Sequence, residues 1–235
     1  MNLGSPIRKL TVAAAALLLV ASVSTADAFS LRVPQVALNG ASLQAYLNGV
    51  GETINVNTDQ VDGQVWSTSV SGNSTFTIML EAAGNAAFNS IGIYNIDDPN
   101  AMPALFQVFP GAASPGWFAT AHFGAGGSLV VTLFDNNSVI MGQTFYAGVN
   151  KSRFGFYLQG PGGTFFSDDT RNGGFAQILT YAGTGINFGT WWECFEDVPY
   201  VQSDKDFEDV VLLVESVSAT TTDGMTWGRL KKLYR

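Results

Sequence analysis

Apolar residues fall along most of this chain in short runs of four to eight, the length of a strand rather than of a helix. The runs are rich in β-branched and aromatic residues, and Gly, Asn, Asp or Pro stands between them. This pattern is typical of strands joined by turns. The clearest predicted strands are TINVN from Thr53, STFTIML from Ser74, SIGIYN from Ser90, ALFQVF from Ala104, SLVVTLF from Ser128, RFGFYLQ from Arg153, AQILTYA from Ala176, WWECFE from Trp191 and DVVLLVES from Asp209.

One segment has the spacing of a helix. Residues 42–48 predict a short helix near the N-terminus, with Ser42 as its cap and Gly49 as its end. Further along, LVVTLF and SVIM flank the residues DNN at 135–137, which predicts a hairpin whose turn tolerates positive φ. Residues 210–214 are apolar at every position, so we expect this strand to lie in a sheet covered on both faces.

A series of strands without helices between them predicts an all-β fold, a β-sandwich or jelly roll of mostly antiparallel strands, and not a βαβ fold. The sequence has no internal repeat and no linker that would divide it. We therefore predict one β-sandwich domain over residues 29–217. The Thr-rich residues 218–235, which end in GRLKKLYR, are expected to form a flexible tail.

The first residues have the pattern of a secretory signal. Arg8 and Lys9 precede the apolar run 10–20, and Ala26 and Ala28 form the small-residue cleavage site. We predict a signal peptide over residues 1–28, a mature chain that begins at Phe29, and export to the periplasm, the cell surface or the medium. The apolar run is shorter than the ~20 residues that span a bilayer, and a retained signal anchor is the alternative. No transmembrane segment is expected after cleavage.

The composition narrows the class of partner. Charged residues are 13% of the chain, about half the usual ~25%, and the formal net charge is −8. Nucleic acid and anionic membranes both require clustered Lys and Arg, so neither is expected as a partner. An extracellular glycan or surface polymer remains as the expected class of partner. Cys194 is the single cysteine, so the chain has no internal disulfide.

The acidic residues are concentrated in one short stretch before the apolar run at 210–214, where the only base is Lys205. Two carboxylates ~4 Å apart repel by about 4 kcal/mol at an effective dielectric of ~20. A hard cation would reverse that term, and Ca²⁺ takes six to eight oxygen ligands. The acids of this stretch are Glu196, Asp197, Asp204, Asp206, Glu208 and Asp209.

Other metals and other loops fit this stretch less well. One His and one Cys supply too few ligands for Zn²⁺. An EF-hand is excluded because Asp209 stands where its loop needs Gly, and the apolar strand follows directly. Two interpretations are left: a turn that binds Ca²⁺ at a sheet edge, or a solvated acidic loop that caps turns and protects the edge.

Several motifs of this chain resemble the secreted domain of unknown function catalogued as number 4114, in the branch that includes proteins with PEP-CTERM sorting tails. That family has a Phe-Tyr-Leu strand, a TFYSD…N turn and a closing F-E-D followed by D-x-D-F-N-D-V-V. Here Glu208 stands where the family has Asn or a small polar residue, and the Pro-Glu-Pro motif is missing. The matching residues are Phe156-Tyr157-Leu158, Thr164 to Asp168 with Asn172, Phe195-Glu196-Asp197 and Asp204-x-Asp206-Phe207-x-Asp209.

The resemblance implies an extracellular β-sandwich with a divalent-metal loop and no known reaction. Together with the acidic stretch, it leads us to expect one Ca²⁺ at the start of the apolar strand. The expected ligands are Asp204, Asp206 and Asp209 with Glu196 or Asp197.

Candidates for catalysis are weak. His122 has no Ser or Cys motif beside it, and neither G-x-S-x-G nor H-E-x-x-H occurs. Cys194 is expected to be a small buried side chain. We therefore expect a non-enzymatic structural or adhesion module, with a carbohydrate-binding module that uses exposed Trp or Tyr as the alternative and a hydrolase third. The rings considered for sugar stacking or the core are Trp66, Trp117, Trp191 and Trp192.

Overall fold

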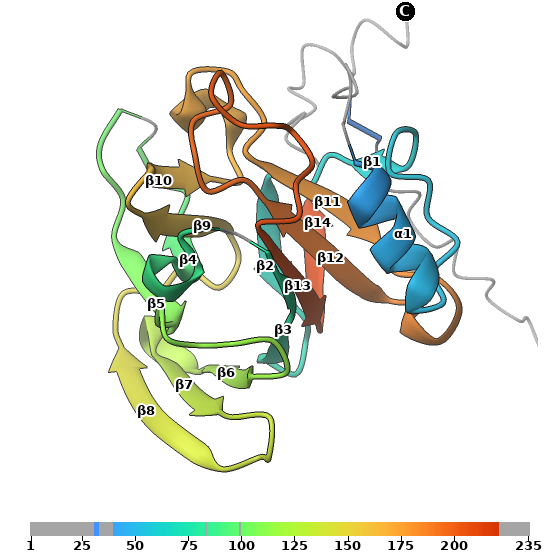
Figure 1. The fold of residues 1–235 in the computed structure, drawn as a ribbon. Coiled ribbons are helices and arrows are strands. Elements are labelled where there is room, and N and C mark those ends of the chain that lie inside the picture. The colour runs from blue at the N-terminus through green and yellow to red at the C-terminus, as the bar shows by residue number, and fades with distance from the viewer. Residues whose placement is uncertain (1–30, 33–39, 83, 99, 221–235) are drawn as a thin grey trace, which may run out of the picture.

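The computed structural model describes residues 31–32, 40–82, 84–98 and 100–220. Two antiparallel sheets pack face to face as a β-sandwich, and one α-helix lies near the N-terminal end of the described chain (Figure 1). The predicted all-β fold is therefore confirmed. Between the strands are four short 3₁₀ helices, η1 (Ala86–Phe88), η2 (Ala125–Gly127), η3 (Asp169–Asn172) and η4 (Gly185–Asn187).

The first sheet has eight strands in the order β1-β11-β12-β13-β3-β6-β7-β8. It brings together three segments that are far apart in sequence, since β3 lies between β13 and β6. The strands are β1 (Gln60–Val61), β3 (Asn73–Glu81), β6 (Phe118–Phe123), β7 (Leu129–Phe134), β8 (Ile140–Tyr146), β11 (Ile178–Ala182), β12 (Thr190–Phe195) and β13 (Val210–Glu215).

The second sheet covers the inner face of the first and has the order β14-β2-β9-β4-β5, with β10 paired to β9. Its strands are β2 (Val65–Thr68), β4 (Ser90–Asn95), β5 (Leu105–Phe109), β9 (Phe154–Gly160), β10 (Gly163–Phe166) and β14 (Val217–Thr220).

Strand β13 is covered on both faces, as its unbroken apolar sequence predicted. Val210, Leu212 and Val214 lie in the core between the two sheets. Val211 points to the other side, into a second apolar cluster that includes residues of the helix. Burying both faces fixes the position of β13, and with it the start of the strand where the acidic loop ends.

Helix α1 (Ala41–Gly49) covers the outer face of the first sheet through its buried residues Leu43 and Leu47. The predicted helix is confirmed, but Ser42 is not its cap. Gly40 precedes the helix, and no side chain caps it. Ser42 is the second residue of the helix and lies inside its first turn.

The predicted strand TINVN from Thr53 is wrong. Its Ile54 and Val56 are buried in the cluster under α1, which accounts for the alternation, but no strand pairs with the segment. Instead the side-chain amide of Gln44 supplies its hydrogen bonds. Gln44 Nε2 donates to the Ile54 carbonyl oxygen at 2.7 Å, and Val56 N donates to Gln44 Oε1 at 3.0 Å.

Two boundaries also differ from the predictions. In the β7–β8 hairpin the residue with positive φ is Ser138, and Asp135 instead accepts the backbone N–H groups of Asn137 and Val139. At the other end of the chain, β14 pairs with β2, so residues 218–220 belong to the sandwich and not to the tail. The reversal into β14 uses Ser216 at φ 60°.

The predicted signal peptide, residues 1–28, and the rest of the predicted tail, residues 221–235, lie outside the described residues. Within the described ranges, no helix has the length and apolar character needed to cross a membrane.

Candidate metal centre

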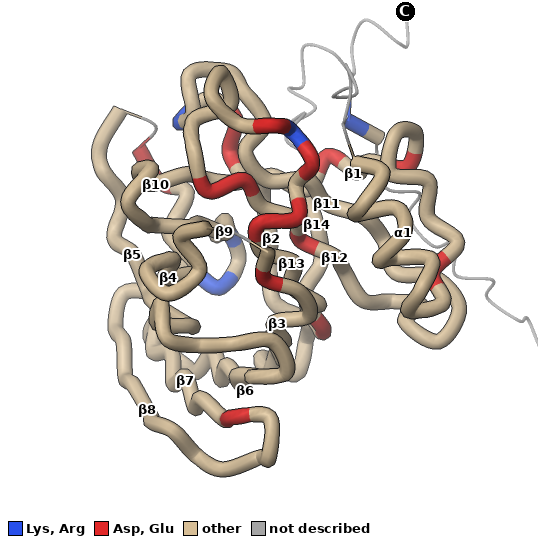
Figure 2. Tube along the Cα trace, viewed as in Figure 1, with Lys and Arg blue, Asp and Glu red and all other residues tan. Residues whose placement is uncertain are grey.

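The candidate site lies in the loop 196–209, which joins the adjacent antiparallel strands β12 and β13. Figure 2 shows acidic positions gathered along this loop, with one basic position among them. The base of this segment in the sequence is Lys205. The start of the loop is held to the neighbouring segment by Gln177. Its carbonyl oxygen accepts Glu196 N at 3.0 Å, and its Nε2 donates to the Val198 carbonyl oxygen at 2.7 Å.

The second half of the loop is wound by two residues in the left-handed region, Lys205 at φ 64° and Phe207 at φ 56°. Neither is glycine, so each conformation costs free energy that other contacts must offset. The Phe207 ring is fully buried under α1, and Lys205 Nζ lies 5.0 Å from the centre of the Tyr200 ring. Tyr200 is in turn stacked on Phe175 at 5.1 Å.

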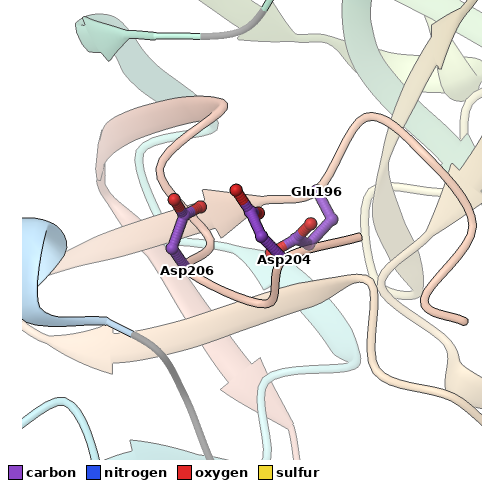
Figure 3. Close-up of side chains that lie close together, drawn as sticks. All are labelled: Glu196, Asp204 and Asp206. Carbon is purple, nitrogen blue, oxygen red and sulfur yellow. The ribbon is translucent and has the colours of Figure 1, made fainter. Parts of the chain in front are cut away.

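This winding brings together three carboxylates of the loop. One oxygen each of Glu196, Asp204 and Asp206 lies within 4.8 Å of the others, and Figure 3 shows the three side chains gathered around one point. Glu196 follows the last residue of β12 and is fully buried, Asp206 is partly buried, and Asp204 is exposed. The cluster therefore has a buried floor and an open side.

Glu196 differs from the other two because it is fully buried and one of its buried oxygens makes no hydrogen bond. Oε1 accepts the backbone N–H of Phe207 at 2.9 Å. Oε2 is buried and makes no hydrogen bond. The nearby Ser203 hydroxyl donates to the Tyr200 carbonyl oxygen at 3.3 Å, and it is also close enough to Glu196 to lower the pKa of that carboxyl. An unsatisfied buried polar atom of this kind costs about 1–3 kcal/mol, and more when it is charged.

The pKa of Glu196 is raised to about 7, mainly by burial, with smaller increases from Asp209 and Asp206 and opposing effects of Phe207 N and Ser203. Burial also raises the pKa of Asp206, with Asp204 and Glu208 adding to the rise. Near neutral pH the loop thus holds carboxylates that the protein alone does not fully stabilise in the ionised form.

The structure places the other two predicted ligands differently. Asp209 Oδ2 accepts the backbone N–H of Asp197 at 2.8 Å, which closes the loop at its base. Asp197 Oδ2 accepts Asn89 Nδ2 at 2.9 Å, which ties the loop to the second sheet's side of the sandwich. The pKa of Asp209 is raised to about 7, mainly by burial, with the charges of the neighbouring acids adding to the rise and the hydrogen bond from Asp197 N opposing it. These two acids hold the loop, and neither belongs to the group of three.

The chemistry and the spacing of the three carboxylates fit a hard cation. All the converging atoms are carboxylate oxygens, which Ca²⁺ and Mg²⁺ prefer and which suit softer metals less. Two ligands on opposite sides of a Ca²⁺ ion, each at ~2.4 Å, lie about 4.8 Å apart. Three carboxylates give fewer than the six to eight ligands of Ca²⁺, so water or loop carbonyls would supply the rest.

The aromatic residues considered for sugar stacking lie mostly in the core. Trp66, Trp191 and Trp192 are buried, with their Nε1 atoms donating to Gly63 O, Val217 O and Glu52 Oε1. Trp117 is partly buried against the same core. These rings therefore offer no exposed platform, and the interpretation as core is confirmed for the three buried ones.

His122 and Cys194 also lie where the sequence suggested. His122 is on the exposed face of β6, with Nδ1 2.7 Å from Asn73 Oδ1, and Cys194 is buried under α1. The structure adds one group that sequence reasoning missed, the carboxylate of Glu52, which is buried beside Trp192. No local sequence signal identifies it, because all its partners are more than a hundred residues away.

No protein-family model matches the chain, and no curated protein matches it. The resemblance to the secreted domain of unknown function therefore stays a prediction.

Proposed function

We propose that this protein is an exported, non-enzymatic structural or adhesion module whose β12–β13 loop binds one Ca²⁺. The observation that carries the calcium site is Glu196 Oε2, a buried oxygen without a partner in a cluster that also contains Asp204 and Asp206. Export rests on the signal-like N-terminus, and the class of module rests on the sequence resemblance and the weakness of the catalytic motifs.

Calcium at this point would act as a cross-link within the loop. Glu196 belongs to the end of β12, whereas Asp204 and Asp206 belong to the turn that leads into β13. A cation between them would satisfy Glu196 Oε2 and replace carboxylate repulsion with attraction. Its role is to hold the turn in one conformation outside the cell, where Ca²⁺ is abundant.

The test is thermal unfolding of the purified protein with millimolar Ca²⁺ and after removal of divalent cations. A ligand at a hundredfold excess over Kd adds about 2.7 kcal/mol to the stability of the native state. For a domain of this size we expect Ca²⁺ to raise Tm by roughly 5–10 °C.

The informative variant is Asp206→Asn, which removes one charge and keeps an oxygen to accept Glu208 N. It should fold without calcium and lose most of the shift. Glu208→Gln is the matched control, because it removes one charge from the same turn outside the group of three and should keep the shift. A wild-type Tm indifferent to Ca²⁺, or a full response in Asp206→Asn, would leave the loop as a solvated acidic turn.

A further inference from the structure

One end of the sandwich is almost free of charge. From residue 99 to residue 150 the sequence contains no Lys or Arg and a single acid, Asp135. This stretch forms β5, β6, β7 and β8, which lie together at one end of the molecule, and Figure 2 shows that end nearly uniform in colour apart from one acidic position. In a chain of net charge −8, this is where two copies would repel each other least.

The outer face of this end is a grid of uncharged side chains set by the pairing of β6, β7 and β8, with one register shift between β7 and β8 at Leu133/Phe134. The middle row is Thr120, Thr132 and Gln143, and Gln143 Nε2 donates to Thr132 Oγ1 at 3.0 Å. The rows on either side are more apolar. They consist of Phe118, Phe134 and Ile140 on one side, and of His122, Val130 and Phe145 on the other.

Strand β8 closes this grid and is the last strand of the first sheet. Within the described residues it pairs only with β7, so its other edge presents backbone N–H and C=O groups to solvent. It contains no charged residue and no proline, which are two of the usual protections of an exposed edge, and its pairing with β7 has one irregularity, a register shift between Leu133 and Phe134. Large apolar side chains that are at least 50% exposed are concentrated here, at Val139, Ile140, Met141 and Phe145.

We propose that a second copy of this chain pairs with β8 along its open edge, antiparallel and across a two-fold axis. The two first sheets would then join into one continuous sheet. A strand that pairs with its own copy meets the same residues in reverse order, so an uncharged strand meets no like charge across the axis. The pairing would satisfy the open backbone groups and bring Ile140 and Phe145 of both copies together, while the acidic loops stay at the far ends.

A neutral glycan is the other occupant that an uncharged face could take, and the geometry favours it less. Phe118 and Phe134 stack on each other at 4.7 Å with 6° between their planes, so each ring covers one face of the other. Stacking on a sugar needs exposed ring faces. A glycan would also leave the backbone edge of β8 unpaired. The proposal does not depend on the calcium site.

The experiment is sedimentation of the exported protein over a range of concentrations, with and without Ca²⁺. Because one strand edge is a small interface, we expect a reversible dimer with a Kd of roughly 1–100 µM. Gln143→Lys places a charge on the outer face at the middle of β8 and should weaken dimerisation at least tenfold, with Tm unchanged. Ile186→Lys is the matched control, since Ile186 is 93% exposed on η4, outside the proposed interface, and its substitution should leave the dimer intact.

A wild-type protein that stays monomeric at ~1 mM overturns the proposal, as does a dimer that Gln143→Lys leaves unchanged. Retention of a monomeric wild-type protein on an insoluble neutral polysaccharide, lost in Gln143→Lys, also overturns it and assigns the face to a glycan. Slower hydrogen exchange of the β8 amides at high protein concentration, absent in Gln143→Lys, supports edge pairing over contact between side chains alone.

Discussion

A buried glutamate lies near each end of strand β12, and the two carboxyl groups differ in how many hydrogen-bond donors surround them. Near the start of β12, Glu52 comes from the segment after α1 and contacts the turn that leads into the strand. Just after the end of β12, Glu196 begins the acidic loop. Both side chains are almost completely removed from solvent.

Glu52 has a full set of donors. Its Oε1 accepts Trp192 Nε1 at 2.9 Å and Asn187 Nδ2 at 2.6 Å, and its Oε2 accepts the backbone N–H and the hydroxyl of Thr184. Burial raises the pKa of Glu52, but these hydrogen bonds outweigh it and hold the pKa below its ordinary value. Both oxygens of this carboxylate are therefore satisfied by donors of the protein itself, and the side chain links the segment after α1 to the sheet.

Glu196 has one backbone donor on Oε1 and none on Oε2, and burial leaves its pKa raised to about 7. Burial of an acid therefore says little about its role, whereas the number of donors around it distinguishes a structural clamp from a ligand group. This difference is the physical basis for assigning the cation to one end of β12 and not to the other.

The largest effect should come from Glu52→Gln. The amide keeps one acceptor oxygen and turns its NH₂ toward donors, so two of the buried hydrogen bonds are lost and their donors are left unpaired. We expect a loss of about 2–4 kcal/mol in the free energy of unfolding, measured by urea denaturation. Glu215→Gln, at an exposed position of β13, is the control and should change stability little. A mild effect of Glu52→Gln would mean that its clamp contributes little to the fold.

The fold could be predicted to a large extent because burial leaves its mark on local sequence. β13 was recognised because it is apolar at every position, and β3, β4 and β9 because of their β-branched and aromatic residues. β6 was missed because Ala and Thr fill half of FATAHF, so its inward residues Ala119 and Ala121 look unremarkable.

The site could be predicted only as a region. The density of acids identified the loop, but which carboxylates converge depends on Lys205 and Phe207, whose left-handed conformation has no signature in non-glycine residues. Asp197 was counted as a ligand, and its bond to Asn89 from a distant segment could not be read from the sequence. Glu52 was missed for the same reason, since folding alone brings its donors to it.

Glu196→Gln should have an intermediate effect on the free energy of unfolding. The pH dependence of this effect distinguishes Glu196 from Glu52. A carboxyl with a raised folded pKa contributes stability that is present below its ordinary pKa of ~4.3 and is lost as the pH rises through about 7. For Glu52 the sign is opposite: its contribution is present above the ordinary pKa and is lost as the pH falls through its lowered value.

In protein freed of divalent cations, Glu196→Gln should therefore be more stable than wild type at pH 8 by about 1–3 kcal/mol, and similar to it at pH 5. With Ca²⁺ at pH 8 the variant should lose the calcium shift. Urea unfolding at the two pH values measures both effects, with Glu208→Gln as the control from the same turn. A variant that is less stable than wild type at both pH values would show that Glu196 is a satisfied structural acid.

The smallest effect should come from a third buried glutamate, Glu193, which lies inside β12 between the two ends. It is fully buried, and its two oxygens lie 3.0 Å from the single hydroxyl of Thr180. Burial raises its pKa well above the ordinary value, with Thr180 and Arg32 opposing the rise, so burial favours the protonated, neutral form of this side chain. Gln has nearly the same shape and keeps an oxygen to accept the Thr180 hydroxyl. Glu193→Gln should therefore change the free energy of unfolding by less than about 1 kcal/mol, with no difference between pH 5 and pH 8.

A loss of several kcal/mol that grows toward pH 8 would show instead that Glu193 is ionised and paired with Arg32. Donor number would then fail as the rule that separates the acids of this strand.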